Sequence, residues 1–155
     1  MHIHRWFLGA LALALLAAPL QAERKLSGTF TKTESGLRIA EVQPGKGPGA
    51  AMGQTLGMLY RGWIYDTTVG RQGKLFDSNL DRKKPLVFKL GEGRVIKGWD
   101  EGLLGIKKGA KRILIIPPEL AYGEKGAGEV IPPGATLLFE VEAVSLAGEA
   151  APAIQ

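Results

Sequence analysis

Aromatic and branched aliphatic residues gather around short, glycine-punctuated turns in the second half of this chain. The run VIKGWDEG at 95–102 is followed by AYG at 121–123 and by IPPG at 131–134. Apolar side chains at such turns are typical of a cleft that binds a ligand. Because no nucleophile–base pair and no metal-ligand cluster accompanies them, the sequence indicates a chemistry that an apolar cleft can perform unaided.

Reactive side chains are scarce. Both histidines, His2 and His4, lie in the first 22 residues, and the chain contains no cysteine. If that leader is removed, a Ser-His-Asp or Cys-His arrangement and a zinc ion bound by His or Cys are excluded. Asp77 lies between apolar neighbours and a turn, without the second carboxylate that glycosidases require. It either caps a turn through the backbone or makes a polar contact on a cleft wall.

Two other signals have structural explanations. The glycines of GEGRVIKG at 91–98 do not have dinucleotide-binding spacing, and no Gly-Lys-Ser or Gly-Lys-Thr follows for a phosphate-binding loop. They are interpreted as sharp turns on either side of Val95 and Ile96. Trp99 taken alone is typical of a packed core, whereas Tyr122 in a glycine-rich loop and Phe76 beside a turn favour contact with a ligand.

The first 22 residues have the layout of a secretory signal peptide. A basic start ending at Arg5 precedes an apolar run from Trp6 to Leu20, and Ala22 ends a cleavage site before Glu23. The alternative is a retained membrane anchor, although the run is short for a span of about 20 residues. We expect an exported protein with no stable membrane anchor after processing. A periplasm is the expected compartment, with secretion or a eukaryotic lumen as the alternative.

The chain is basic, with a net charge of +5 that becomes +4 when Arg5, the only charged residue of the leader, is removed. Basic groups lie at 82–84, 107–108 and 111–112, each beside a turn or a strand end. No nucleic-acid recognition motif accompanies them, so a solvated surface is favoured over a nucleic-acid patch. A mild attraction to anionic surfaces is compatible with this charge.

Alternating apolar and polar residues predict strands at 37–42, 55–65, 74–78, 86–90 and 137–143, and an apolar run ended by two prolines predicts another at 111–116, with turns or loops at 43–49 and 66–73. The spacing of Ile96, Trp99 and Leu103 predicts one short helix that ends at Gly105. With no room for parallel crossovers, the sheet must be mainly antiparallel, and this helix is the only cover for one face. The expected organisation is a signal peptide at 1–22, a flexible lead-in at 23–35, one folded domain at 36–146 and a frayed tail at 147–155.

Taken together, these motifs resemble the FKBP-type peptidyl-prolyl cis-trans isomerases. The similarity runs from about Gly36 to Leu146 and rests on FDS at 76–78, VIKGW at 95–99, AYG at 121–123, IPP at 131–133 and ATL at 135–137 followed by Phe139. The resemblance implies an α+β fold in which a curved antiparallel sheet of five or six strands wraps around one short helix. It also implies a cleft between sheet and helix, with no cofactor and no metal.

The resemblance assigns roles to twelve residues. Trp99 would form the floor of the cleft, and the Ile96 N–H and the Tyr122 hydroxyl would bind carbonyl groups of a peptide. The residues expected to act in catalysis are Tyr60, Phe76, Asp77, Trp99, Tyr122 and Phe139. Those expected to bind the substrate are Leu86, Phe88, Val95, Ile96, Val130 and Ile131.

The chain departs from common family features at a few positions. Leu59 stands where many members have histidine, Leu86 where an aromatic residue is common, and Ala127 where some members have histidine. These differences concern substrate preference and inhibitor strength more than activity. The long helical dimerisation arm of some exported relatives is missing from the pattern, so a monomer is expected.

An apolar cleft suffices for prolyl isomerisation, which needs no proton transfer and no covalent intermediate. The twisted X–Pro amide has lost its resonance and is less dipolar than the planar form, so withdrawing water favours it. The expected partners are proline-containing peptides and unfolded exported proteins, with macrolides as inhibitors and no nucleic acid. The alternative function is a proline-segment binding module or chaperone with little turnover.

The signal-peptide hypothesis predicts the amino terminus of the protein purified from its host. Because Ala22 ends the expected cleavage site, amino-terminal sequencing and intact mass should give a chain that begins at Glu23. A purified chain that still carries residues 6–20 would support the membrane-anchor alternative instead.

Overall fold

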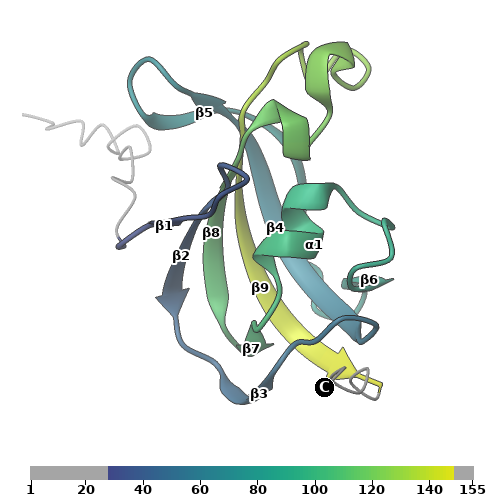
Figure 1. Cartoon of the computed structure of the whole chain (residues 1–155). Coiled ribbons are helices and arrows are strands. Elements are labelled where there is room, and N and C mark those ends of the chain that lie inside the picture. The colour runs from purple at the N-terminus through teal and green to yellow at the C-terminus, as the bar shows by residue number, and fades with distance from the viewer. Residues whose placement is uncertain (1–27, 149–155) are drawn as a thin grey trace, which may run out of the picture.

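A computed structural model of the protein describes residues 28–148, which form strands, one short α-helix and two 3-10 turns (Figure 1). The predicted signal peptide at 1–22, the start of the lead-in and the tail beyond residue 148 lie outside the described residues. Seven strands form one antiparallel sheet in the order β1-β2-β8-β9-β4-β5, with β6 paired to the first part of β4. Their bounds are β1 Thr31–Lys32, β2 Arg38–Gln43, β4 Thr55–Asp66, β5 Arg71–Asn79, β6 Leu86–Lys89, β8 Lys111–Ile116 and β9 Leu137–Ala147.

A smaller two-stranded sheet pairs β3 (Lys46–Gly49) with β7 (Lys107–Lys108). The helix α1 (Lys97–Gly102) lies across one face of the main sheet, and the 3-10 turns η1 (Pro118–Leu120) and η2 (Gly123–Lys125) follow β8 (Figure 1). The predicted α+β fold, an antiparallel sheet with one short helix, is confirmed. Between residues 28 and 148, no helix is long and apolar enough to cross a membrane.

Side-chain alternation decides which face of the sheet carries the main core. In β9, Leu137, Phe139 and Val141 are buried on the side of α1, while Glu140 and Glu142 point to the other side. The predicted alternation of buried and outward-facing side chains in this strand is therefore confirmed. β8 also has the predicted bounds, because its apolar run ends at a pair of prolines that cannot donate to a ladder.

Two glycines let α1 approach the sheet closely. A Cβ added to Gly98 would overlap the side chain of Ile116, and one added to Gly102 would lie 2.9 Å from Leu114 Cδ2. The helix is shorter than predicted, because Ile96 is its N-cap and it ends at Gly102. A helix of six residues has no stability of its own, so this packing must supply it.

The outer face of the sheet is also partly covered, contrary to the prediction that the helix is the only cover. A second buried cluster lies there, made of Tyr65, Ile113, Ile115 and Leu138, with Phe30 and Trp63 packed against it. The guanidinium of Arg38 lies 5.3 Å from the centre of the Tyr65 ring, a cation–π contact. This cluster was not predicted, because alternation along a strand does not show which side chains cover its outer face.

Part of the predicted flexible lead-in belongs to the fold. β1 pairs with β2 through Thr31↔Ile39 and Lys32↔Arg38. The Ser35 hydroxyl lies 2.7 and 2.8 Å from the two carboxylate oxygens of Glu101 in α1. A strand of two residues has no period that a sequence could reveal, and neither β1 nor the pairing of β3 with β7 was predicted.

The β4–β5 hairpin is longer than predicted because one carboxylate holds its turn. β4 continues to Asp66 and β5 begins at Arg71, so the predicted loop at 66–73 shrinks to a turn at 67–70. Asp66 Oδ1 accepts hydrogen bonds from the Thr68 hydroxyl at 2.5 Å, the Thr68 N–H at 2.9 Å and the Val69 N–H at 3.3 Å. These bonds, that of the Thr68 hydroxyl first, hold the pKa of Asp66 below its ordinary value.

Candidate functional site

Five aromatic side chains from five elements meet where α1 lies against the sheet. Trp99 of α1, only 3% exposed, is the centre of the group. Its ring centroid lies 5.3 Å from that of Tyr60, 5.3 Å from that of Phe139 and 5.8 Å from that of Phe88. Phe76 joins through Phe139 at 5.5 Å, with the two ring planes at 89°. Edge-to-face contacts of this kind add to the stabilisation that burial provides, and we call these five residues the aromatic cluster.

A β-bulge brings Phe76 into the aromatic cluster. On β5, Asp77 and Leu75 each pair with a residue of β4, and Phe76 is the extra residue between them. A bulge changes the direction of a side chain relative to a regular strand. The ring of Phe76 accordingly meets that of Phe139, which reaches the same place from β9.

Gly62, in the middle of β4, leaves room for two of the rings. A Cβ at this position would lie 2.6 Å from Phe139 Cε1 and 2.7 Å from Phe76 Cζ, which is closer than Cβ atoms approach their neighbours. Gly62 was not among the residues predicted to shape the site. The available signal was an isolated glycine within a strand pattern, which marks a bulge or the close approach of another group.

A hydrogen bond joins the aromatic cluster to a carboxylate, since the Tyr60 hydroxyl donates to Asp77 Oδ2 at 2.8 Å. Asp77 lies within β5 rather than at a turn, so of the two predicted alternatives the structure shows a polar contact beside the rings. Burial raises the pKa of Tyr60 to about 12, with further contributions from the hydrogen bond and charge of Asp77 and from Tyr122. Tyr60 therefore stays protonated well above neutral pH.

Two N–H groups at this site have no acceptor among residues 28–148. Trp99 Nε1 is buried without a hydrogen-bond partner, which ordinarily costs about 1–3 kcal/mol. The carbonyl of Ile96 accepts the N–H of Trp99 at 2.9 Å and that of Asp100 at 3.3 Å, but its own N–H donates no hydrogen bond within that range. Donors left free beside apolar side chains are groups that a ligand can satisfy.

Asp100 fixes the loop that leads into α1, and the sequence analysis did not assign it this role. Its carboxylate accepts the backbone N–H of Gly91 at 2.8 Å and that of Gly93 at 3.1 Å. Both glycines have positive φ, 84° and 68°, which other residues rarely adopt. Asp100 thereby positions Val95 and Ile96 beside the aromatic cluster. An acidic residue in a first helical turn was visible in the sequence, but not the N–H groups that it accepts.

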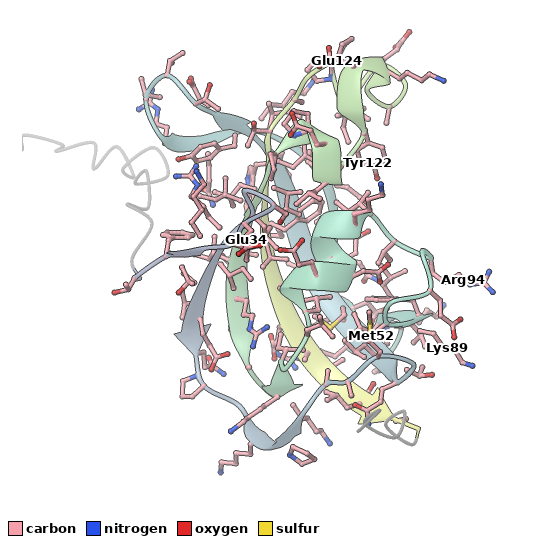
Figure 2. All side chains as sticks on the ribbon, in the orientation of Figure 1. Glu34, Met52, Lys89, Arg94, Tyr122 and Glu124 are labelled. Atoms are coloured by element: carbon pink, nitrogen blue, oxygen red, sulfur yellow. The ribbon has the colours of Figure 1, made fainter. Side chains whose placement is uncertain are left out.

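The segment 118–134, which we call the flap, follows β8 and is held by its own backbone. Ala127 and Ile131 exchange two hydrogen bonds, at 2.8 and 3.1 Å, and the Gly134 N–H donates to the Gly123 carbonyl at 2.9 Å. Ile131 is buried in the main core, so it anchors the flap to the body of the protein. Figure 2 shows Tyr122 of the flap beside one end of α1.

The structure gathers nine of the twelve predicted site residues in and around the main core. Four are buried, namely Phe88, Trp99, Ile131 and Phe139, and five pack against them, namely Tyr60, Phe76, Leu86, Val95 and Ile96. Asp77 joins the group through its hydrogen bond to Tyr60. Tyr122 and Val130 are 41% and 50% exposed and lie outside the core, on the flap.

The chemistry available here is apolar contact and hydrogen bonding. The aromatic cluster offers ring faces, and the Ile96 N–H and the Tyr122 hydroxyl are polar groups at its edge. Within residues 28–148, no group of three or more His, Cys, Asp or Glu side chains could hold a metal ion. The arrangement suits a ligand that is held rather than covalently attacked.

Comparison with known proteins relates the chain to one family. The sequence pattern of the FKBP-type peptidyl-prolyl cis-trans isomerases matches residues 47–144. An FK506-binding protein of Neisseria meningitidis is 52% identical over 107 residues, which cover 69% of this chain and 93% of that protein. FK506-binding protein 2B of Rhizopus delemar is 57% identical over 94 residues, which cover 61% of this chain but only 43% of the fungal protein. The crystal structure of AtFKBP13 matches with a TM-score of 0.66 and 41% identity, over 77% of this chain and 99% of that one.

Replacing Gly62 with alanine should displace the Phe76 and Phe139 rings, because the added Cβ overlaps both. Overpacking of this kind lowers the free energy of unfolding by about 1–3 kcal/mol, measurable by denaturant titration. The indole N–H resonance of Trp99 should shift as well. Gly57→Ala on the same strand is the matched control, because its Cβ would meet Ser145 instead and should leave that resonance in place. Wild-type stability and an unmoved Trp99 signal in Gly62→Ala would contradict the ring contacts described here.

Alkaline titration should reveal Tyr60 as a late-ionising tyrosine. The absorbance of tyrosinate near 295 nm should show a step at about pH 12 that is missing in Tyr60→Phe. Asp77→Asn should move that step to lower pH by removing a neighbouring charge. Because the pKa of Tyr60 is higher in the folded than in the unfolded protein, its contribution to stability is complete below pH 10 and is lost as the pH rises towards 12. A step unaffected by Tyr60→Phe would assign it to another tyrosine.

Proposed function

This chain belongs to the FKBP-type peptidyl-prolyl cis-trans isomerases, and from that premise we propose that its aromatic cluster accelerates the rotation of X–Pro bonds in exported proteins that are folding. The observation that carries the proposal is the convergence of three rings on Trp99, with Phe76 joined through Phe139, beside an exposed flap tyrosine. Trp99 is the floor on which a proline ring rests. The walls are Tyr60, Phe76, Phe88 and Phe139.

The physical basis of the proposed catalysis is the withdrawal of water from the amide. Rotation about an X–Pro bond faces a barrier of about 18–20 kcal/mol and takes tens to hundreds of seconds without a catalyst. The planar amide is more dipolar than the twisted one, so water stabilises the ground state more. A site lined by aromatic rings removes that advantage and lowers the barrier without covalent chemistry.

Hydrogen bonds at the edge of the aromatic cluster orient the peptide in this proposal. The free N–H of Ile96 donates to one peptide carbonyl, and the exposed hydroxyl of Tyr122 donates to another. Tyr60, already bonded to Asp77, presents its ring rather than a free hydroxyl. Fixing the chain on both sides of the proline lets the preceding carbonyl turn while the proline ring stays in place.

The proposed substrates are proline-containing segments of unfolded exported proteins, and macrolides are the proposed inhibitors. Relatives at 52% and 57% identity carry the name FK506-binding protein, which supports a macrolide site on this chain. The export of the protein rests on the signal-peptide pattern at 1–22, with a periplasm as the proposed compartment. No cofactor is required by the proposed reaction.

A protease-free isomerisation assay on a Leu-Pro or Phe-Pro peptide tests this function. The wild-type protein should accelerate the exchange, and Trp99→Leu should lower kcat/KM roughly tenfold or more, about 1.4 kcal/mol of barrier. Phe139→Ala should do the same, and because both variants remove a buried ring, each needs a parallel unfolding measurement. Tyr122→Phe changes only an exposed hydroxyl, so it tests the peptide contact without loss of fold. Trp63→Phe, on the outer face of β4, is the matched control and should retain full activity.

Macrolide binding gives a second measurement on the same variants. Rapamycin should change the fluorescence of Trp99 in the Trp63→Phe background and block the isomerase activity. If the protein bound the peptide without accelerating its cis-trans exchange, it would be a proline-segment binding module and not an isomerase. Full activity in Trp99→Leu would place the active site elsewhere on the protein.

A further inference from the structure

The most one-sided charge distribution on the molecule lies away from the aromatic cluster. Seven cationic side chains lie on β3, on β7, at the start of β8 and on the loop between β5 and β6, and we call them the basic band: Lys46, Arg82, Lys83, Lys84, Lys107, Lys108 and Lys111. Six of the seven are lysines, and all but the half-buried Lys111 are exposed. The flap has the opposite character, with three glutamates and one lysine.

The first part of the basic band is a group of like charges in register. Lys46 of β3 is the direct cross-strand partner of Lys108 of β7, and Lys107 precedes it. Like charges placed opposite each other destabilise a strand pair. None of these three lysines forms an ion pair with any residue from 28 to 148. The smallest sheet of the protein thus carries an uncompensated charge of +3.

A single carboxylate joins two cations of the second part of the basic band. Glu142 of β9 lies 2.7 Å from Arg82 and 3.8 Å from Lys111. Lys83 and Lys84 follow Arg82 on a loop stiffened by hydrogen bonds, in which the Asp81 carboxylate accepts the Lys83 N–H at 2.9 Å. With Glu142 and Asp81 set against seven cations, the basic band keeps an excess of +5.

Exposed apolar side chains accompany the lysines. Leu80 and Val87 flank the loop that carries Lys83 and Lys84, and they are 56% and 59% exposed. Leu80 also lines an outer-face hollow of about 90 Å³ together with Leu59, Lys111 and Glu142. Lysines interleaved with exposed aliphatic groups fit the interface of an anionic lipid bilayer, where phosphates meet acyl chains.

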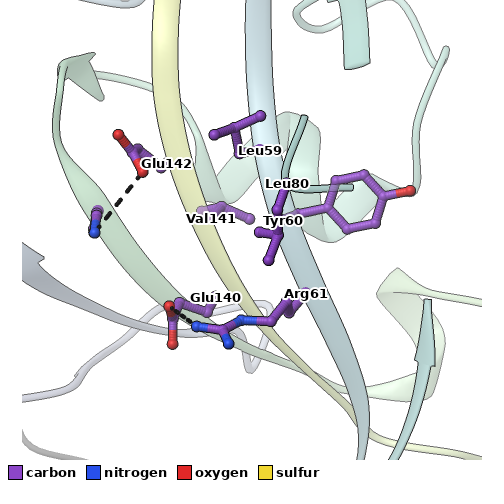
Figure 3. A pocket seen from close by; sticks show the side chains of 8 residues that line it. Leu59, Tyr60, Arg61, Leu80, Glu140, Val141 and Glu142 are labelled. Atoms are coloured by element: carbon purple, nitrogen blue, oxygen red, sulfur yellow. Dashed lines mark hydrogen bonds and ion pairs between the residues drawn. The ribbon is translucent and has the colours of Figure 1, made fainter. Parts of the chain in front are cut away.

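The basic band points away from the proposed active site. Arg61 and Glu140 form their ion pair on the outer side of β4 and β9, while the Tyr60 ring is directed away from them (Figure 3). In Figures 1 and 2, which share one orientation, β3 and β7 lie at the opposite end of the molecule from Glu124 of the flap. A membrane that touches the basic band therefore leaves the aromatic cluster and the flap open.

We propose that the basic band is a docking surface for an anionic phospholipid membrane, on which the protein rests peripherally with its aromatic cluster facing away. The attraction comes from lysines near lipid phosphates, about 1 kcal/mol for each. Leu80 and Val87 enter the interfacial layer. The acidic flap is repelled, which sets the orientation. A nucleic acid fits less well, because the exposed aliphatic groups would gain nothing on a sugar-phosphate backbone and no base-reading element accompanies the lysines.

Vesicle sedimentation of the processed protein tests the proposal. Vesicles of phosphatidylglycerol and phosphatidylcholine should bind the protein at low salt and release it as salt rises, and pure phosphatidylcholine should not. The double variant Lys107→Glu/Lys108→Glu should weaken binding by about 30-fold or more, the effect of two lysines. Lys83→Glu/Lys84→Glu should do likewise. The control variant Lys32→Glu/Lys74→Glu makes the same change of charge outside the basic band. It should bind anionic vesicles more tightly than either of the two basic-band variants.

Three outcomes would overturn the proposal. One is equal binding to neutral and anionic vesicles, and another is anionic binding that the two basic-band variants do not weaken relative to the control. The third is retention of duplex DNA more strongly than anionic vesicles at the same salt, which would make a nucleic acid the partner. The isomerase assay is run on every variant, because none of these lysines belongs to the proposed active site. Loss of membrane binding in a variant that keeps isomerase activity therefore tests the docking surface separately from the proposed function.

Discussion

Trp99 lies between a six-residue helix and a curved sheet, in contact with rings that come from β4, β6 and β9. A helix of this length does not form alone, so the burial of the indole is what keeps α1 folded. Removing a buried aromatic ring typically costs about 3–5 kcal/mol, a large part of the stability of an ordinary domain. The close approach that permits this burial comes from Gly98 and Gly102, which present no Cβ to β8.

The same contact also fixes the polar groups around the rings. Once α1 is in place, Asp100 can hold the N–H groups of Gly91 and Gly93, and the loop between them and the helix acquires one conformation. Ile96 then stands at the N-cap with its N–H free. On the opposite side, burial and the hydrogen bond to Asp77 raise the pKa of the Tyr60 phenol, and this bond also holds the ring in place. A site built this way is ordered before a ligand arrives, which limits the entropy lost on binding.

Sequence reasoning succeeded where local pattern controls the outcome. The strand at 111–116, the alternation in β9 and the presence of one short helix all follow from periodicity and from glycine or proline at the ends. It failed where a contact joins distant residues or depends on an irregularity. The hydrogen bond from Ser35 to Glu101 and the pairing of β3 with β7 have no local signal, and the bulge that turns Phe76 inward has only an indirect one, the isolated glycine at Gly62. The cover over the outer face was missed for the same reason, since Phe30 and Trp63 meet Leu138 only in three dimensions.

The period of two in a strand gives this small protein two surfaces that can be used separately. Along β4, Tyr60 faces the helix while Leu59 and Arg61 face outward. Along β9, Phe139 likewise faces the helix and Glu140 faces outward. Groups on opposite faces of a sheet share few neighbours, so changes on one face should add to changes on the other rather than couple with them. The single sheet that holds the rings together therefore also keeps surface charge out of the apolar site. That separation allows a basic protein to keep an apolar interior around Trp99, because most of its lysines lie on the surface, where water can reach them.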